Sequence, residues 1–179
     1  LLVEAGDHEG TLWREYSPAS MAHAGIERRY FTEPNARRLD GMRLTISSWR
    51  ASGQITADEE RLLIADLMAA ANTVANTAGT YGCFLSKWQP AALRLVSMEP
   101  RELPATTPPF EIRVGDASAI QAGPSDTLYL DPPFTKRQYA CYYHILETIA
   151  HGDAPAVAGV AGLRPWRHPA SAFSYKRHA

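Results

Sequence analysis

The stretch that most constrains the fold of this 179-residue chain runs from Thr127 to Phe134 and reads Thr-Leu-Tyr-Leu-Asp-Pro-Pro-Phe. Its short apolar run predicts a buried β-strand that ends at Asp131. Pro132 and Pro133 each fix their own φ at about −65° and favour extended geometry in the residue before them. The sequence therefore predicts a rigid turn at the carboxyl end of a buried strand.

The groups on this turn suit a planar hydrogen-bond donor. Proline has no N–H but keeps its carbonyl, so the Asp131 carboxylate and the Pro132 carbonyl offer two acceptors, and Phe134 adds a flat apolar face. An exocyclic amino group of a nucleobase matches such a site because it donates two hydrogens. The alternative is a turn without a further role, since Asp and Pro both favour turns.

The residues that follow extend this motif into a recognisable pattern. The segment Asp131-Pro132-Pro133-Phe134, then Arg137-Gln138-Tyr139, then the run Tyr-His-Ile-Leu-Glu-Thr-Ile-Ala over 143–150 resembles the catalytic region of N6-adenine-specific DNA methyltransferases. The similarity is greatest to the branch found in bacterial restriction–modification systems. The resemblance implies a site-specific enzyme that transfers a methyl group from S-adenosylmethionine to the N6 amino group of adenine in double-stranded DNA.

The chemistry of that reaction gives each motif residue a role. The adenine amino nitrogen is a poor nucleophile because its lone pair is delocalised into the ring. Hydrogen bonds to the Asp131 carboxylate and the Pro132 carbonyl favour a pyramidal nitrogen, so that catalysis depends on orientation and electrostatics. The base must leave the duplex to reach the site, and Phe134 offers it a stacking surface. We therefore expect residues 131–134 to be catalytic.

Two other functions remain open from the sequence. Asp-Pro-Pro-Phe also occurs in methyltransferases that act on guanine amino groups of ribosomal RNA, although the matches at 137–139 and 143–150 favour the DNA enzyme. The chain could also be a non-catalytic DNA-binding remnant, because it lacks the glycine-rich cofactor loop of the family. The nearest candidate, Ala78–Gly82, follows a predicted helix rather than a strand. We expect a second polypeptide or further segments to supply this loop.

A second strand is predicted just before the motif. Phe110–Val114 alternates apolar and polar residues and ends at Gly115-Asp116. A crossover of about a dozen residues to the next strand is typical of parallel neighbours. We therefore expect an α/β fold: part of a doubly wound, Rossmann-like class I methyltransferase sheet with an inserted helical subdomain. The resemblance places Asp116 beside the cofactor adenine, and an ordinary aspartate at a strand end is the alternative.

The helical subdomain is predicted from caps and apolar periodicity. Thr32-Glu33-Pro34 is typical of a helix start, and Leu39, Met42, Ile46 and Trp49 then recur at helical spacing. Thr56–Glu59 is a capping box that opens a second helix, which should pack on the first as a hairpin. We divide the chain into an irregular segment (1–29), a helical, DNA-contacting subdomain (30–100) and the truncated catalytic part (101–179).

Binding to DNA must depend on local features, because the formal net charge is −1. Asn76, Gly79 and Tyr81 match an Asn-x-x-Gly-x-aromatic turn that lies close to the DNA in the family, although Gly79 also fits a helix C-cap. Exposed Lys and Arg side chains can meet phosphates, or contact only water. The residues that we expect to contact DNA are Asn76, Tyr81, Lys87, Lys136, Arg137, Arg164 and Lys176.

The remaining composition narrows the class of protein. Apolar residues make up 45% of the chain and charged residues 21%, which indicates a globular protein. Cys83 and Cys141 have no metal-type spacing, so we expect no metal site and reduced thiols, as in a cytoplasmic protein. No apolar run approaches the roughly 18 residues of a membrane span, and we expect no membrane partner.

Overall fold

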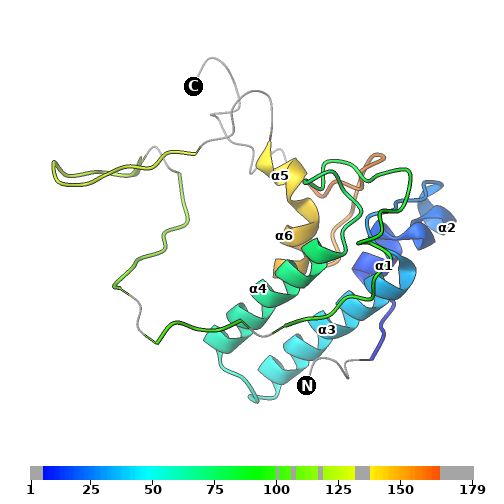
Figure 1. Ribbon diagram of the computed structural model, residues 1–179, viewed down its shortest axis with the longest axis horizontal. Coiled ribbons are helices and arrows are strands. Elements are labelled where there is room, and N and C mark those ends of the chain that lie inside the picture. The colour runs from blue at the N-terminus through cyan, green and yellow to red at the C-terminus, as the bar shows by residue number, and fades with distance from the viewer. Residues whose placement is uncertain (1–5, 100, 106–107, 117–118, 132–137, 166–179) are drawn as a thin grey trace.

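The computed structural model describes residues 6–99, 101–105, 108–116, 119–131 and 138–165. Its helices gather into one body, and the described stretches 101–105, 108–116 and 119–131, which we call the extended arm, lie away from them (Figure 1). The helical elements of the described residues are α1 (Thr11–Tyr16), the 3-10 helix η2 (Pro18–Ser20), α2 (Met21–Ala24), α3 (Glu33–Ala51), α4 (Ala57–Thr73), α5 (Tyr139–Tyr142) and α6 (His144–His151).

Helices α3 and α4 form the predicted hairpin, and both begin where the sequence indicates. The Thr32 side chain accepts a hydrogen bond from the Asn35 N–H at the start of α3. At the start of α4, the Thr56 hydroxyl accepts from the Glu59 N–H at 3.2 Å, and the Glu59 carboxylate accepts from the Thr56 N–H at 2.7 Å. This reciprocal capping box satisfies amide groups that have no partner inside the helix.

The core is built between α3, α4, α1 and α6. Leu39, Met42 and Ile46 of the predicted α3 face are at most 1% exposed, and Leu67 of α4 is fully buried. Each such side chain contributes about 1.5–3 kcal/mol through the removal of apolar surface from water. Ile145 and Ile149 of α6 join the same cluster, so the helix that follows the motif is part of the helical body.

The residues before α3 are more ordered than their sequence indicates. The segment 6–29 shows no helical periodicity, yet it contains α1, η2 and α2, and places Leu12 and Tyr16 in the core. Asp40 of α3 explains why a helix starts at Thr11, because its carboxylate accepts hydrogen bonds from the N–H groups of Gly10, Leu12 and Trp13 at 2.8–3.1 Å. The cap of α1 therefore comes from a residue far away in the sequence.

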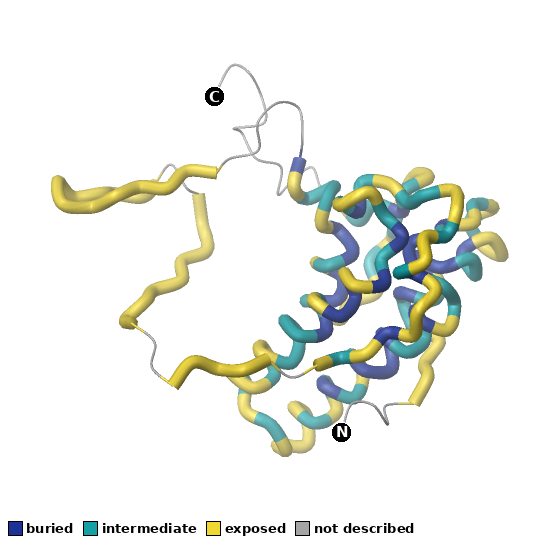
Figure 2. Tube along the Cα trace, viewed as in Figure 1, coloured by how far each residue is buried: buried dark blue, intermediate teal, exposed yellow. Residues whose placement is uncertain are grey.

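The prediction of a doubly wound α/β sheet is wrong. Within the described residues there is no β-strand, and the pairing is limited to an isolated antiparallel bridge between Ala158 and Leu163. The two expected strands, 110–114 and 127–130, lie in the exposed arm (Figure 2). Val114 is fully exposed and Leu130 is 69% exposed. Alternation fixes only which side chains share a face, and a strand also requires a partner for its N–H and C=O groups.

The apolar spacing of Tyr142, Ile145, Leu146 and Ile149 predicts a single helix from about Gln138 to His151. In the structure this helix is broken into two, α5 and α6. Tyr143, between α5 and α6, has φ −120° and ψ 14°, outside helical geometry. Ile145 and Ile149 are buried as the apolar periodicity predicts. In the described part of the chain, every helix is too short or too polar to cross a membrane.

Candidate functional site

The structure describes the two ends of the motif segment. Asp131 is exposed at the end of the extended arm, whereas Gln138, at the start of α5, is only 6% exposed. The Gln138 carbonyl accepts hydrogen bonds from the N–H groups of Cys141 and Tyr142 at 3.0 and 3.2 Å. The helical body thus fixes the carboxyl-terminal end of the segment. The other expected site residues of this region and the tail lie outside the described residues: Pro132, Pro133, Phe134, Lys136, Arg137 and Lys176.

Asp116, the expected cofactor residue, lies in the exposed arm as well. Its carbonyl accepts a hydrogen bond from the Ala119 N–H at 3.0 Å. Its position beside a cofactor adenine stays a prediction.

Asn76 organises the loop 76–89 from a fully buried position. Its side-chain amide donates to the Leu85 carbonyl at 3.1 Å, and its side-chain oxygen accepts from the Gln89 N–H at 3.0 Å. Its backbone N–H donates to the Tyr30 carbonyl at 2.8 Å. Because the side chain is engaged within the protein, the geometry gives Asn76 the role of shaping this loop.

Tyr81 lies in the same loop and is only 3% exposed. Its hydroxyl donates to the Asn72 side-chain oxygen at 2.7 Å, and its N–H donates to the Tyr142 carbonyl at 2.8 Å, which ties the loop to α5. Burial raises the pKa of Tyr81 well above its usual range. Gly79, between Asn76 and Tyr81, has φ 105°, a conformation that favours glycine.

The expected DNA contacts with charged side chains differ in their surroundings. Lys87 is exposed on the loop 76–89. Arg164 donates two hydrogen bonds to the Asp153 carboxylate at 2.9 and 2.8 Å and one to the Thr148 hydroxyl at 3.2 Å. Its guanidinium plane is held in place and its charge is paired within the chain. DNA contact by either residue stays a prediction.

His144 begins α6 in the centre of the core. It is fully buried, and its ring packs edge-on against Tyr16 and Tyr30 with centroid distances of 5.6 and 5.9 Å. Its Nδ1 lies 2.8 Å from the Cys141 carbonyl and its Nε2 lies 3.2 Å from the Ala161 carbonyl. Burial lowers the pKa of His144, and its contacts with the two carbonyls oppose that effect. These contacts make His144 a structural link between α5 and the turn 158–163.

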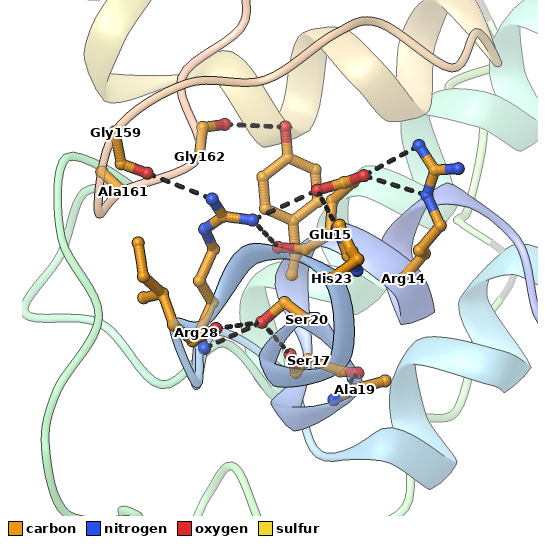
Figure 3. A network of polar contacts seen from close by, with 12 residues as sticks. Arg14, Glu15, Ser17, Ala19, Ser20, His23, Arg28, Gly159, Ala161 and Gly162 are labelled. Atoms are coloured by element: carbon orange, nitrogen blue, oxygen red, sulfur yellow. Dashed lines mark hydrogen bonds and ion pairs between the residues drawn. The ribbon is translucent and has the colours of Figure 1, made fainter.

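Buried polar side chains also donate hydrogen bonds to the turn 158–163, and sequence analysis did not single them out. Arg28 is only 3% exposed and donates to the carbonyls of Gly159 and Val160 at 3.1 Å and to the Glu15 carboxylate at 3.1 Å (Figure 3). The Tyr16 hydroxyl donates to the Gly162 carbonyl at 3.1 Å. The Tyr30 hydroxyl donates to the Ala161 carbonyl at 3.0 Å. We call the contacts of Tyr16, Arg28, Tyr30 and His144 with residues 159–162 the turn clamp.

The charges around Glu15 favour its ionised carboxylate, which is the partner of Arg28 in the turn clamp. Burial raises the pKa of this carboxyl, but the hydrogen bonds and charges of His23 and Arg14 outweigh that effect, so its pKa lies below the usual value. Glu15 and Arg28 lie in a segment without apolar periodicity. The only sequence signal was the presence of opposite charges 13 positions apart, which is too common to single them out.

Comparisons with known proteins identify the family. The profile of the D12 class N6 adenine-specific DNA methyltransferases matches residues 12–178. The chain is 37% identical over 171 residues to the type II methyltransferase M.FokI of Planomicrobium okeanokoites, covering 95% of this chain and 26% of the relative. It is 36% identical over 166 residues to the type II methyltransferase M.NlaIII of Neisseria lactamica, covering 92% of this chain and 48% of the relative.

The chain thus spans between about a quarter and about half of the length of these relatives. No solved structure matches it significantly. Because the profile match extends over nearly all of its residues, the chain belongs to the family of D12 class N6 adenine-specific DNA methyltransferases.

Proposed function

We propose that this chain carries the catalytic motif of a restriction–modification methyltransferase that methylates the N6 amino group of adenine in double-stranded DNA. One observation carries the proposal: the family match includes the motif at 131–134 and the helices that follow it. M.FokI and M.NlaIII are both type II methyltransferases. The activity of the whole protein is part of the proposal, because the chain covers 26% and 48% of these relatives.

The proposed mechanism assigns the handling of the adenine to the motif. The Asp131 carboxylate and the Pro132 carbonyl accept the two amino hydrogens, and Phe134 stacks on the extruded ring. These hydrogen bonds concentrate electron density on the nitrogen and orient its lone pair. No covalent intermediate with the protein is needed.

S-adenosylmethionine is the methyl donor in this family, but the described residues alone do not form a site that fits it. Asp116 and Asp131 are exposed in the extended arm, and neither lines the pocket beside Asp40 or the pocket beside Tyr139. We therefore derive only the steps that hold and orient the adenine, and propose that other segments or a second polypeptide complete the cofactor site.

The test is methyl transfer by the natural polypeptide that carries this sequence. Purified protein is incubated with labelled S-adenosylmethionine and either a mixed-sequence DNA duplex or ribosomal RNA, and the modified bases are identified by mass spectrometry. We expect N6-methyladenine in DNA. Methylguanine in RNA would support the ribosomal RNA enzyme instead, and DNA binding without any transfer would support the non-catalytic remnant.

A further inference from the structure

A pocket lies beside the junction of α5 and α6. Its volume is about 410 Å³, within the range of roughly 300–1,000 Å³ typical of small-ligand sites. It belongs to the helix pair that directly follows the motif segment, and only residues 135–138 separate Phe134 from its first lining residue. The side chains that matter for its chemistry are Tyr139, Tyr143, Glu147, His151 and Arg164.

The two tyrosines provide exposed aromatic surface. Their ring centroids lie 5.7 Å apart at an interplanar angle of 72°, so the edge of one ring meets the face of the other. Tyr139 is 43% exposed and Tyr143 is 41% exposed, whereas Tyr16, Tyr30 and Tyr81 are at most 3% exposed. The edge-to-face pair holds the two rings in place and leaves aromatic surface free for a further planar ring.

The charges in the pocket favour a neutral ring over a phosphate. Arg164 is paired with Asp153 at 2.8 Å, and Glu147 lies 3.4 Å from the imidazole of His151. A phosphate would have to compete with Asp153 for the guanidinium. A nucleobase would stack on tyrosine, and its N–H groups could donate to the Glu147 carboxylate.

We infer that the pocket of Tyr139 and Tyr143 binds an unpaired nucleobase of the DNA substrate. The inference rests on the proposed function, because extrusion of the target adenine, which Phe134 and Asp131 hold, leaves the base opposite it unpaired. Tyr139 and Tyr143 are then base-binding residues beside the catalytic motif.

The test measures binding without cofactor or methyl transfer. The 179-residue chain is titrated into a single-stranded DNA 12-mer that contains 2-aminopurine, and quenching of the probe reports stacking. An abasic 12-mer with the same number of phosphates, measured by competition, separates base contacts from phosphate contacts. The variants are Tyr139→Ala and Tyr143→Ala, with Tyr139→Phe as the conservative change. Phe110→Ala is the matched control, because Phe110 is an aromatic residue that is 75% exposed in the arm.

We expect wild type, Phe110→Ala and Tyr139→Phe to quench the 2-aminopurine probe equally and to bind the 12-mer with the same affinity. Each tyrosine-to-alanine variant should bind roughly 5- to 150-fold more weakly. The abasic strand should compete poorly. Circular dichroism checks that each variant keeps its helices, and the competition by the abasic strand, which needs only the wild-type chain, decides the question if an alanine variant does not.

Three outcomes would overturn the inference: wild type without quenching, alanine variants that bind like wild type, or an abasic strand that competes as well as the normal one. Each of these differs from a failure of the proposed function, which is the absence of N6-methyladenine in the transfer assay. An RNA 12-mer that binds more tightly than the DNA would also contradict the assignment to DNA.

Discussion

Replacing Arg28 by methionine tests the turn clamp. Arg28→Met keeps a long side chain but removes the donors to the carbonyls of Gly159 and Val160 and to the Glu15 carboxylate. Arg28 and Glu15 side chains are 3% and 5% exposed, so water cannot replace these partners without a structural change. Removing one member of a buried ion pair costs about 3–5 kcal/mol.

The lower end of that range applies. The Glu15 carboxylate keeps Arg14 at 2.9 Å and His23 at 3.1 Å, so its charge is not left without compensation. We therefore expect a loss of about 3 kcal/mol in the free energy of unfolding. For a domain of this size that corresponds to a decrease of about 6–12 °C in Tm.

The assay is urea unfolding and calorimetry of Arg28→Met beside a matched control. Arg61→Met breaks the ion pair with Asp58, whose side chains are 75% and 87% exposed, and should cost no more than about 0.5 kcal/mol. In the double variant with Glu15→Gln the two losses should not add, because both changes remove the same contact. A loss below about 1 kcal/mol for Arg28→Met, or strict additivity, would refute the reasoning.

Changes at four further residues test other parts of the structure. Asn76→Ala removes two side-chain hydrogen bonds of the loop 76–89 and should cost about 1–3 kcal/mol, which an unchanged urea midpoint would contradict. Asp131→Ala should abolish methyl transfer in the natural polypeptide with DNA binding largely intact, and near-normal turnover would rule out its role. Phe134→Ala should lose roughly 1–3 kcal/mol of stacking, whereas Phe134→Tyr should be tolerated. Burial raises the pKa of Asp40 to about 6, so the folded protein holds a proton that the unfolded chain releases between about pH 4 and 6. The contribution of Asp40 to the free energy of unfolding should therefore fall by roughly 3 kcal/mol as the pH rises through that window. The measurement is the difference in free energy of unfolding between wild type and Asp40→Asn, which should decline over the same pH range. A difference that stays constant with pH would contradict this prediction.

The sequence predicted the elements whose causes are local. The caps at Thr32 and Thr56 and the apolar faces of α3 and α4 depend on residues three or four positions apart, so a single stretch contains the whole signal. The same holds for the buried face of α6. Helix α1 was not predicted because its N-terminal amides are capped by Asp40, 30 positions after Gly10.

The predicted sheet was wrong because the formation of a strand depends on causes that are not local. Phe110, Ile112 and Val114 have the alternation of a strand, but a strand depends on partners that a one-dimensional pattern does not specify. The residues of the candidate site also fall into those that a local pattern identifies and those whose role depends on distant partners. The motif could be read from Asp131 to Phe134, whereas the roles of Asn76 and Tyr81 could not, because their hydrogen-bond partners became known only from the fold. The DNA contacts expected of these two residues stay predictions.

The two kinds of DNA contact proposed for this chain can be separated by their dependence on salt. Ion pairs within the chain engage Arg28 and Arg164, whereas Lys87 is exposed, so Lys87 is the cation chosen to test phosphate contacts. Each phosphate contact adds about 0.9 to the slope of log affinity against log salt on duplex DNA and about 0.7 on a single strand. On the single-stranded 12-mer, Lys87→Ala should therefore lower the slope by roughly 0.7. Tyr139→Ala should weaken binding at every salt concentration and leave the slope unchanged, because stacking on a neutral ring releases no counterions. A reduced slope for Tyr139→Ala would show that the pocket acts on phosphates, and an unchanged slope for Lys87→Ala would remove Lys87 from the DNA-contacting surface.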